Sequence, residues 1–197
     1  MIVFVRLLVL LNLFVQMTTS VAAVTASTQT FAAALDAHWD FDRPAVSEER
    51  FRAELAQWPL ASAEAAEVRT QVARALGLQR KFADANAMLD GVEAGLPELP
   101  AHVRVRYLLE RGRTFNSSGA PQRAVPLFAE ALAQAERDQD EYYAVDAAHR
   151  LGIAAPVAAR LGWNLKALAL AEAATDAPRL ARLAALAIGD TPAPAKP

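Results

Sequence analysis

The residues of this chain whose type and spacing could do chemistry are mainly arginines. Arg74 and Arg113 occupy matching positions in two similar stretches of the sequence. His149 takes the matching position in a third stretch, and Arg106 and Asn116 lie close to Arg113. A guanidinium group binds a carboxylate through two parallel hydrogen bonds. The pattern therefore predicts a basic ladder that recognises an acidic or carboxylate-terminated peptide segment.

The same arginines have a plainer interpretation. Glu67, Glu110 and Asp146 lie at spacings that would let them pair with the arginines across or along helices. In that case the arginines form a solvated face with ion pairs and bind no ligand. The sequence leaves both alternatives open.

Signals for catalysis or metal binding are weak. The three histidines are far apart, and none belongs to a pair with metal-ligand spacing. The densest titratable group is DAHWDFD, with Asp36, His38, Asp40 and Asp42. It could hold a metal, but a capping segment that packs Trp39 and Phe41 against the first helices explains it as well. Nucleophile and phosphate-loop motifs are missing, so we predict no enzyme, no cofactor and no metal. A small all-α hydrolase that depends on His38 is the alternative.

Composition indicates a folded domain of ordinary charge. The chain has 197 residues, 54% of them apolar, and no cysteine, which excludes disordered proteins and disulfide frameworks. Its 20 basic and 22 acidic residues give a net charge of -2. This balance argues against a nucleic-acid surface.

The start of the chain, residues 1–26, has the order of a secretory signal peptide. Arg6 precedes an apolar stretch, and the small, polar run MTTSVAAVTAST follows it. Val24 and Ala26 suit cleavage before Ser27, and Ser20 with Ala22 or Val21 with Ala23 offer alternative cleavage sites. The alternative is an uncleaved membrane anchor, although residues 2–15 fall short of the roughly 20 that a spanning helix needs. We therefore expect a periplasmic or secreted protein, in contact with a membrane only if the leader is uncleaved.

Apolar residues recur at intervals of three and four after the leader, which predicts an all-α protein. Ser47 is expected to cap a helix that runs through Phe51 and ends before Pro59. The other expected helices span about Thr30–His38, Ala63–Leu78, Lys81–Glu93, Ala101–Asn116, Pro121–Asp138, Glu141–Ala155 and Trp163–Thr175. Short loops make consecutive helices antiparallel neighbours, but Pro156 is expected to interrupt the last pair. Pro126 is expected to kink its helix, because proline cannot donate to the carbonyl of Gln122.

Two windows of the chain match at a constant offset. Ala73, Leu76, Phe82, Ala85, Leu89 and Val92 recur as Gly112, Phe115, Pro121, Ala124, Phe128 and Ala131. Small residues stay small, and most large apolar residues stay apolar. This indicates a repeated antiparallel helix pair, in which Phe115 and Phe128 fill the space around a close crossing at Gly112.

These residues resemble the tetratricopeptide repeat family across about Glu64 to Thr175. The second window matches its pattern with Leu108, Gly112, Phe115, Gly119, Ala124, Phe128, Ala131 and Leu132. The first matches with Val72, Ala73, Leu76, Phe82, Ala85, Leu89, Val92 and Pro97, but Arg80 replaces the usual turn glycine. The third keeps Ala148, Leu151, Ala167 and Ala174 with an elongated turn.

The resemblance implies a right-handed solenoid of about three repeats at residues 64–188, with capping helices at 27–63 and a disordered tail at 189–197. Such proteins are non-enzymatic scaffolds that bind a peptide or protein on the concave face. Some bind carboxylates through lysines and asparagines, and this chain lacks those lysines. Leu180, Leu183, Leu186 and Ile188 leave an apolar edge, which predicts a partner or a homodimer through the C-terminal helix.

Overall fold

The computed structural model describes residues 31, 32 and 34–175. The chain divides into two compact units, Met1–Trp39 and Asp40–Pro197, and the helices below belong to the second. The expected signal peptide, the C-terminal helix at residues 180–188 and the tail at 189–197 lie outside the described residues. The expected helix from Thr30 to His38 is seen as helical positions on either side of residue 33.

The second unit is all-α, as the periodicity predicts. Its helices in order are α2 (Pro44–Leu55), α3 (Ala63–Leu78), α4 (Phe82–Glu93), the short 3₁₀ helix η1 (Leu96–Glu98), α5 (Ala101–Ser117), α6 (Pro121–Arg137), α7 (Glu141–Ala154) and α8 (Val157–Ala173). Within the described residues, none of the helices combines the length and apolar character needed to cross a membrane. From α3 to α7 the ends lie within one residue of those expected.

Local side chains and turns explain these helix boundaries. The Ser62 side chain accepts a hydrogen bond from the amide of Ala65 and caps α3, and Asp140 caps α7 in the same way through Tyr143. Gly119 turns the chain after α5 with a φ of 90°, which glycine adopts without a steric cost. Arg80, at the matching position of the first window, turns the chain after α3 with a φ of 61°. The turn therefore keeps its left-handed conformation where the glycine is missing.

The expected cap at Ser47 is wrong. Helix α2 begins at Pro44, the first-turn position that proline favours. Ser47 lies inside the helix and is fully buried. Its hydroxyl donates to the carbonyl of Asp40 and accepts from the Asp40 amide at 2.7 Å. Ser47 therefore fastens the segment that precedes the helix.

The elongated turn expected in the third pair is also wrong. Helix α8 begins at Val157, six residues before Trp163, and Pro156 is its N-cap residue. Because an N-cap residue is not itself helical, proline is tolerated there. Only Ala155 and Pro156 separate α7 from α8. Helix α6 continues through Pro126.

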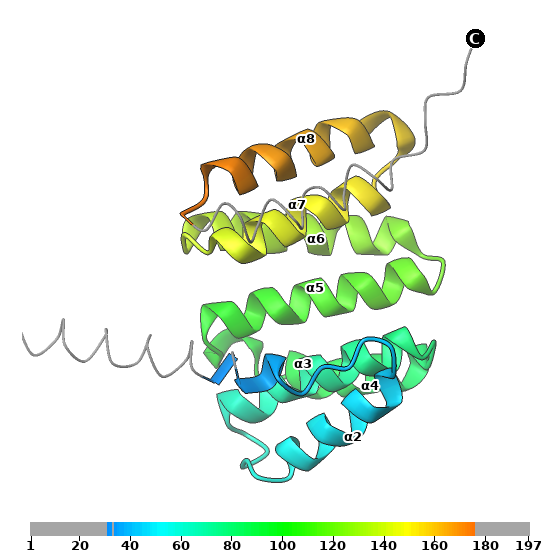
Figure 1. The fold of residues 1–197 in the computed structure, drawn as a ribbon, viewed down its shortest axis with the longest axis vertical. Helices are drawn as coiled ribbons and strands as arrows, with labels where there is room; N and C mark the ends of the chain where they lie inside the picture. The colour runs from blue at the N-terminus through cyan, green and yellow to red at the C-terminus, as the bar shows by residue number, and fades with distance from the viewer. Residues whose placement is uncertain (1–30, 33, 176–197) are drawn as a thin grey trace, which may run out of the picture. The chain divides into compact units, whose positions relative to one another are not determined.

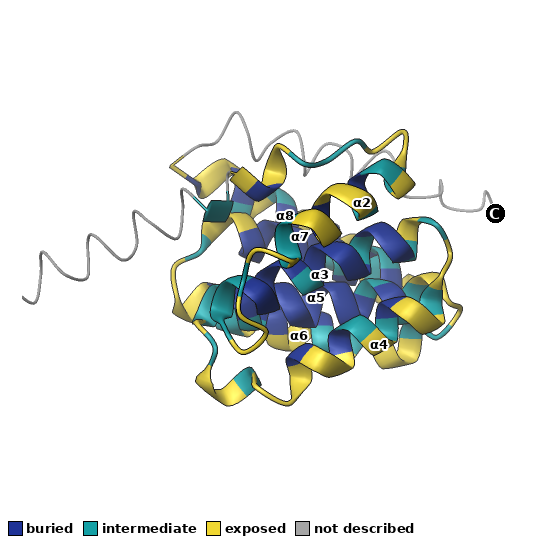
Figure 2. Cartoon of the chain, turned by 90° about the horizontal axis from the view of Figure 1, so that it is seen from below, coloured by how far each residue is buried: buried dark blue, intermediate teal, exposed yellow. Residues whose placement is uncertain are grey.

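Each helix packs on the next along the chain: α2 on α3, α3 on α4, α4 on α5, α5 on α6, α6 on α7, and α7 on α8. Figure 1 shows them stacked from α2 at the bottom of the view to α8 at the top. Helices α3, α5 and α7 also pack on one another as a central row. Each contributes ten buried residues, against three, five and three for α4, α6 and α8 (Figure 2). Several polar residues of the central row, among them Glu67, Glu110 and Asp146, are therefore buried as well.

Two helix crossings bring a glycine against the eighth residue of the following helix. A Cβ added to Gly112 would lie 2.8 Å from Cδ1 and Cζ of Phe128, which is closer than real Cβ atoms come. In the third pair a Cβ on Gly152 would lie 2.7 Å from Cγ of Asn164. The matching α4 residue is Leu89, which is fully buried. Phe115, which was expected to be buried like Phe128, is only half-buried, and the Arg123 guanidinium lies 3.8 Å from its ring centroid.

We expect Gly112→Ala and Gly91→Ala to change stability in opposite directions. The added methyl at Gly112 collides with Phe128, whereas nothing lies within 4 Å of a Cβ at Gly91. Alanine at Gly91 should stabilise the helix by about 0.5–1 kcal/mol, and overpacking at Gly112 should cost about 1–3 kcal/mol. Urea unfolding measures both. A Gly112→Ala protein as stable as Gly91→Ala would contradict the close crossing.

Replacing Phe128 with alanine tests the same crossing from the other side. The ring is 1% exposed, so its loss leaves a cavity that we expect to cost about 3–5 kcal/mol. Leu60→Ala is the control, because Leu60 is 70% exposed and should change the free energy of unfolding by less than about 0.5 kcal/mol. Similar melting temperatures for the two variants would count against this packing.

Candidate functional site

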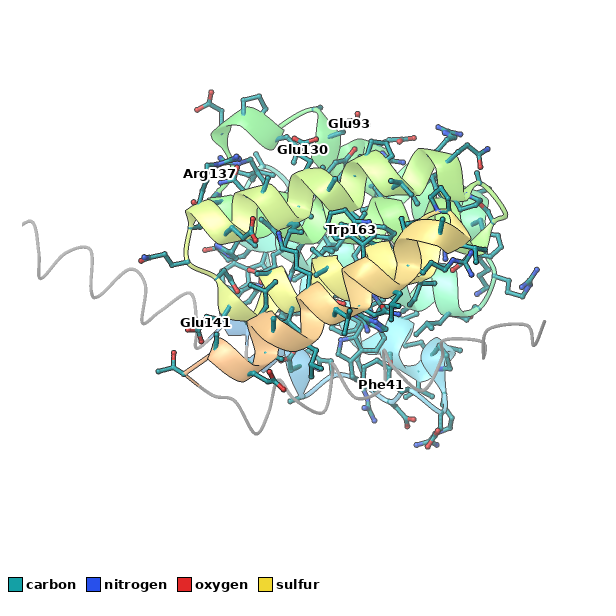
Figure 3. The ribbon with its side chains drawn as sticks, turned by 90° about the horizontal axis from the view of Figure 1, so that it is seen from above. Phe41, Glu93, Glu130, Arg137, Glu141 and Trp163 are labelled. Carbon is teal, nitrogen blue, oxygen red and sulfur yellow. The ribbon has the colours of Figure 1, made fainter. Side chains whose placement is uncertain are left out.

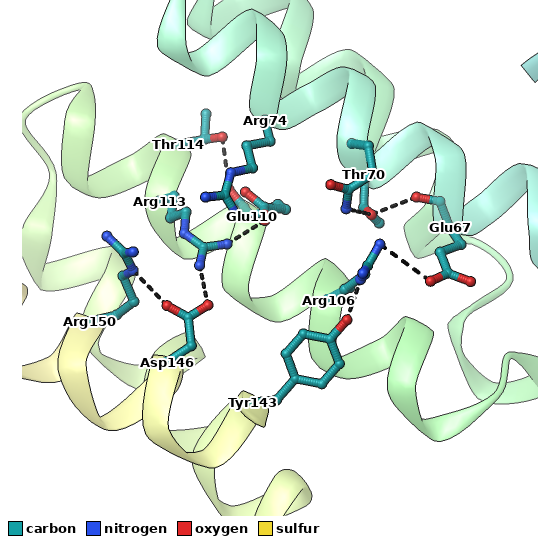
Figure 4. A network of polar contacts seen from close by, with 11 residues as sticks. Glu67, Thr70, Arg74, Arg106, Glu110, Arg113, Thr114, Tyr143, Asp146 and Arg150 are labelled. Carbon is teal, nitrogen blue, oxygen red and sulfur yellow. Dashed lines mark hydrogen bonds and ion pairs between the residues drawn. The ribbon is translucent and has the colours of Figure 1, made fainter. Parts of the chain in front are cut away.

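Three buried carboxylates lie along the central row, one on each helix. Glu67 of α3, Glu110 of α5 and Asp146 of α7 are 2%, 3% and 5% exposed. A carboxylate that is removed from water remains ionised only if it is paired or hydrogen-bonded. The neighbouring arginines supply those partners, and Figure 4 shows the resulting network between the three helices.

Arg113 is the centre of one half of the network. It donates to Glu110 on its own helix and to Asp146 on α7. Arg74 of α3 pairs with the same Glu110 at 3.6 Å, and Arg150 donates through Nε to Asp146 at 3.0 Å. These ion pairs therefore join α3, α5 and α7.

Arg106 is the centre of the other half. Its Nη1 lies 3.3 Å from Oε1 of Glu67, and its Nε donates to the Tyr143 hydroxyl. His102 Nε2 lies 3.3 Å from the second oxygen of Glu67. Burial raises the pKa of Tyr143, so the phenol is neutral at physiological pH. This half therefore also links α3, α5 and α7, through the charged groups of Glu67 and Arg106 and the neutral hydroxyl of Tyr143.

The electrostatics of Arg113 and Asp146 follow from their burial. Burial alone raises the pKa of Asp146, but Arg113, Arg150 and Arg74 outweigh it and hold that pKa well below its usual value. Burial alone lowers the pKa of Arg113, and Asp146 and Glu110 outweigh it and raise the pKa. Arg150 differs, because burial and the charge of Arg113 lower its pKa despite Asp146.

A pocket of about 160 Å³ opens beside this network. Arg74, Arg113 and Arg150 contribute to its wall, together with Glu110 and Asn116. Three guanidinium groups from three helices thus meet at one cavity. This arrangement can bind an anionic group.

The structure brings together three of the five residues of the predicted ladder: Arg74, Arg113 and Asn116 line the pocket. Arg106 and His149 are buried and do not line it. Ile153 follows Gly152 as Arg113 follows Gly112, and it lines the pocket. The register of the helix crossings therefore gives the ladder position on α7 to Ile153 and not to His149.

The sequence offered ion pairs with nearby carboxylates as the alternative to peptide binding by the arginines, and these ion pairs are present. Glu67, Glu110 and Asp146 each pair with arginine, as expected. The prediction of a solvated face is wrong, since these carboxylates are buried. Sequence reasoning missed Arg150, although its spacing of four residues from Asp146 was a usable signal.

The DAHWDFD group contributes a local turn. Asp40 accepts hydrogen bonds from Arg43, and the Arg43 side chain lowers the pKa of that carboxyl. Phe41 was expected to pack against the first helices, but its side chain is 60% exposed, and the Arg74 guanidinium of α3 lies 5.6 Å from its ring centroid. Among the described residues, no three histidine or acidic side chains are grouped closely enough to hold a metal ion.

Comparison with known proteins gives no relative. No family model matches the chain, and neither a curated protein nor a solved structure matches it.

Asp146→Asn should destabilise the protein in a pH-dependent way. Because its pKa is lowered in the folded state, Asp146 contributes stability that is present above its unfolded pKa of about 3.9 and is lost as pH falls below it. At pH 7 we expect the variant to lose about 3–5 kcal/mol, since Arg113 is left buried without this partner. Urea unfolding at pH 7, 5 and 3 should show the difference shrinking towards pH 3.

The matched control is Glu130→Gln, which removes an exposed carboxylate from α6. It should leave the free energy of unfolding nearly unchanged at each pH. A pH-independent difference between Asp146→Asn and the wild type would contradict the lowered pKa.

Proposed function

We propose that this chain is a non-enzymatic binding scaffold of helical-repeat, tetratricopeptide type that holds an acidic or carboxylate-terminated peptide segment. The pocket between α3, α5 and α7 receives the carboxylate. The protein acts outside the cytoplasm if residues 1–26 work as a signal peptide. Binding needs neither metal nor cofactor.

The position of Arg150 carries the proposal. Both oxygens of Asp146 are engaged, one by Arg150 and the other by Arg113. Arg150 thus shares its carboxylate with a second arginine, in a cavity that Arg74 also lines. A ligand carboxylate would offset the repulsion between the guanidinium groups and accept hydrogen bonds from them.

The packing supports the scaffold part of the proposal. Helix α5 meets α6 at Gly112 and helix α7 meets α8 at Gly152, and Ala73 occupies the position of Gly112 in the first window. The left-handed turns at Arg80 and Gly119 have the same spacing as the crossings at Ala73 and Gly112. A stack of equivalent pairs presents its first helices side by side, which is how repeat proteins form extended binding surfaces.

A peptide array tests the proposal with probes of defined chemistry. The purified chain is applied to random decapeptides that carry a free C-terminal carboxylate and to the same peptides with a C-terminal amide. Peptides that bind should contain Asp or Glu or lose affinity on amidation. Affinity should also fall as salt is raised.

Arg150→Gln is the decisive variant for that array. Losing a charge-assisted hydrogen bond should weaken peptide binding about 10- to 100-fold. Arg137→Gln is the control, because Arg137 is exposed at the end of α6 and bonds locally, to Gln134 (Figure 3). Equal binding by the two variants, or equal binding of acids and amides, would exclude the carboxylate site.

A further inference from the structure

A second pocket lies at the other end of the last helix pair. It has a volume of about 210 Å³ and lies between the C-terminal ends of α6 and α8 and the start of α7. Its floor is apolar and includes Ala135, Ala144 and Leu170. Since a cavity of about 150 Å³ can hold a benzene ring, this one has room for at least one leucine side chain.

The rim of this pocket is acidic. Glu136, Asp140 and Glu141 line it, and Lys166 pairs with Glu136 at 2.9 Å. Asp140 is also the N-cap of α7. The ligand that fits is therefore an apolar side chain flanked by positive charges.

The chain reaches this pocket where its described part ends. Ala174 lines the pocket. Thr175 donates through its amide to Glu141 at 3.0 Å and through its hydroxyl to both oxygens of the same carboxylate, at 2.8 and 2.9 Å. Figure 3 shows Glu141 beside the C-terminal end of α8. The residues after Thr175 therefore start at the rim.

The sequence that follows has the required chemistry. Residues 178–183 read PRLARL, so Arg179 and Arg182 alternate with Leu180 and Leu183. Leu180 is five residues from Thr175, which spans at most about 17 Å when extended. Such a short link gives the segment a high effective concentration at the pocket.

We infer that residues 178–188 of the same chain are the ligand of this pocket, with a leucine on its apolar floor and the arginines at its acidic rim. This inference does not depend on the proposed peptide site, because the two pockets share no lining residue.

Disulfide trapping tests the inference directly, because the chain has no native cysteine. Glu136→Cys is combined with Leu183→Cys in the full chain, and oxidised glutathione is added. The control combines Gln122→Cys with Leu183→Cys. Gln122 is exposed near the other end of α6, about 21 Å away at 1.5 Å per residue. Mass spectrometry distinguishes bridges within a chain from bridges between chains.

We expect the Glu136 pair to form an intrachain disulfide at least about 10-fold faster than the control pair. Adding Arg179→Glu and Arg182→Glu should reduce that advantage, because the rim would then repel the segment. Equal rates for the two pairs would overturn the inference. Bridges formed only between chains would also overturn it, and would assign the pocket to a second copy of the protein.

A second pair of cysteines repeats the test in case the first pair disturbs the fold. Ala144→Cys places the thiol on the pocket floor and changes the residue volume little. It is combined with Leu180→Cys, and circular dichroism checks that each protein is folded. A folded protein that forms no intrachain bridge at either position would contradict the proposed docking.

Discussion

The ion pairs of Arg113 are the interaction on which the rest of the site depends. This residue joins Glu110 on α5 to Asp146 on α7, and Arg74 reaches the same Glu110 from α3. Replacing a buried ion pair with apolar residues is often neutral or stabilising, whereas removing one partner is costly. We therefore interpret the network as a device that fixes the register of the three central helices. Close packing of Phe128 on Gly112 and of Asn164 on Gly152 then holds the second helices in place.

The network also explains how a pocket lined by arginines can lie beside a buried core. Arg113 is compensated by two carboxylates, so it is held in a fixed geometry. Arg150 must share Asp146, so positive charge remains at the edge of the cavity. This arrangement supports the proposal that the pocket binds an anionic group. Ile153 supplies an apolar wall where the sequence had suggested a histidine.

Much of the fold could be predicted from the sequence, because its signals are local. Periodicity, Ser62 as a cap and the left-handed turn at Gly119 determine most helix boundaries within one residue. The wrong predictions concern residues whose type suits two different positions at the start of a helix. Ser47 resembles a cap but bonds to the preceding segment, and Pro156 resembles an interruption but is the residue from which α8 starts.

The site was less predictable, since burial depends on contacts distant in sequence. The ion-pair partners could be named, but the complete burial of Glu67, Glu110 and Asp146 follows from packing on several sides of each helix. The prediction that His149 matches Arg74 and Arg113 is wrong for a different reason. The spacing from Gly112 to Gly152 in the first helices is longer than the spacing from Phe128 to Asn164 in the second helices. An alignment that uses one constant offset for both helices of the pair therefore cannot place the α7 residues correctly.

A double-mutant cycle between Arg113 and Asp146 tests the account most directly. The free energy of unfolding would be measured for Arg113→Met, Asp146→Leu and the double variant. A buried pair that fixes the helix register predicts a coupling of about 2 kcal/mol or more, with the double variant more stable than the sum of the single losses implies. Additivity within about 0.5 kcal/mol would show that the two side chains do not depend on each other, and would contradict the central role of this ion pair.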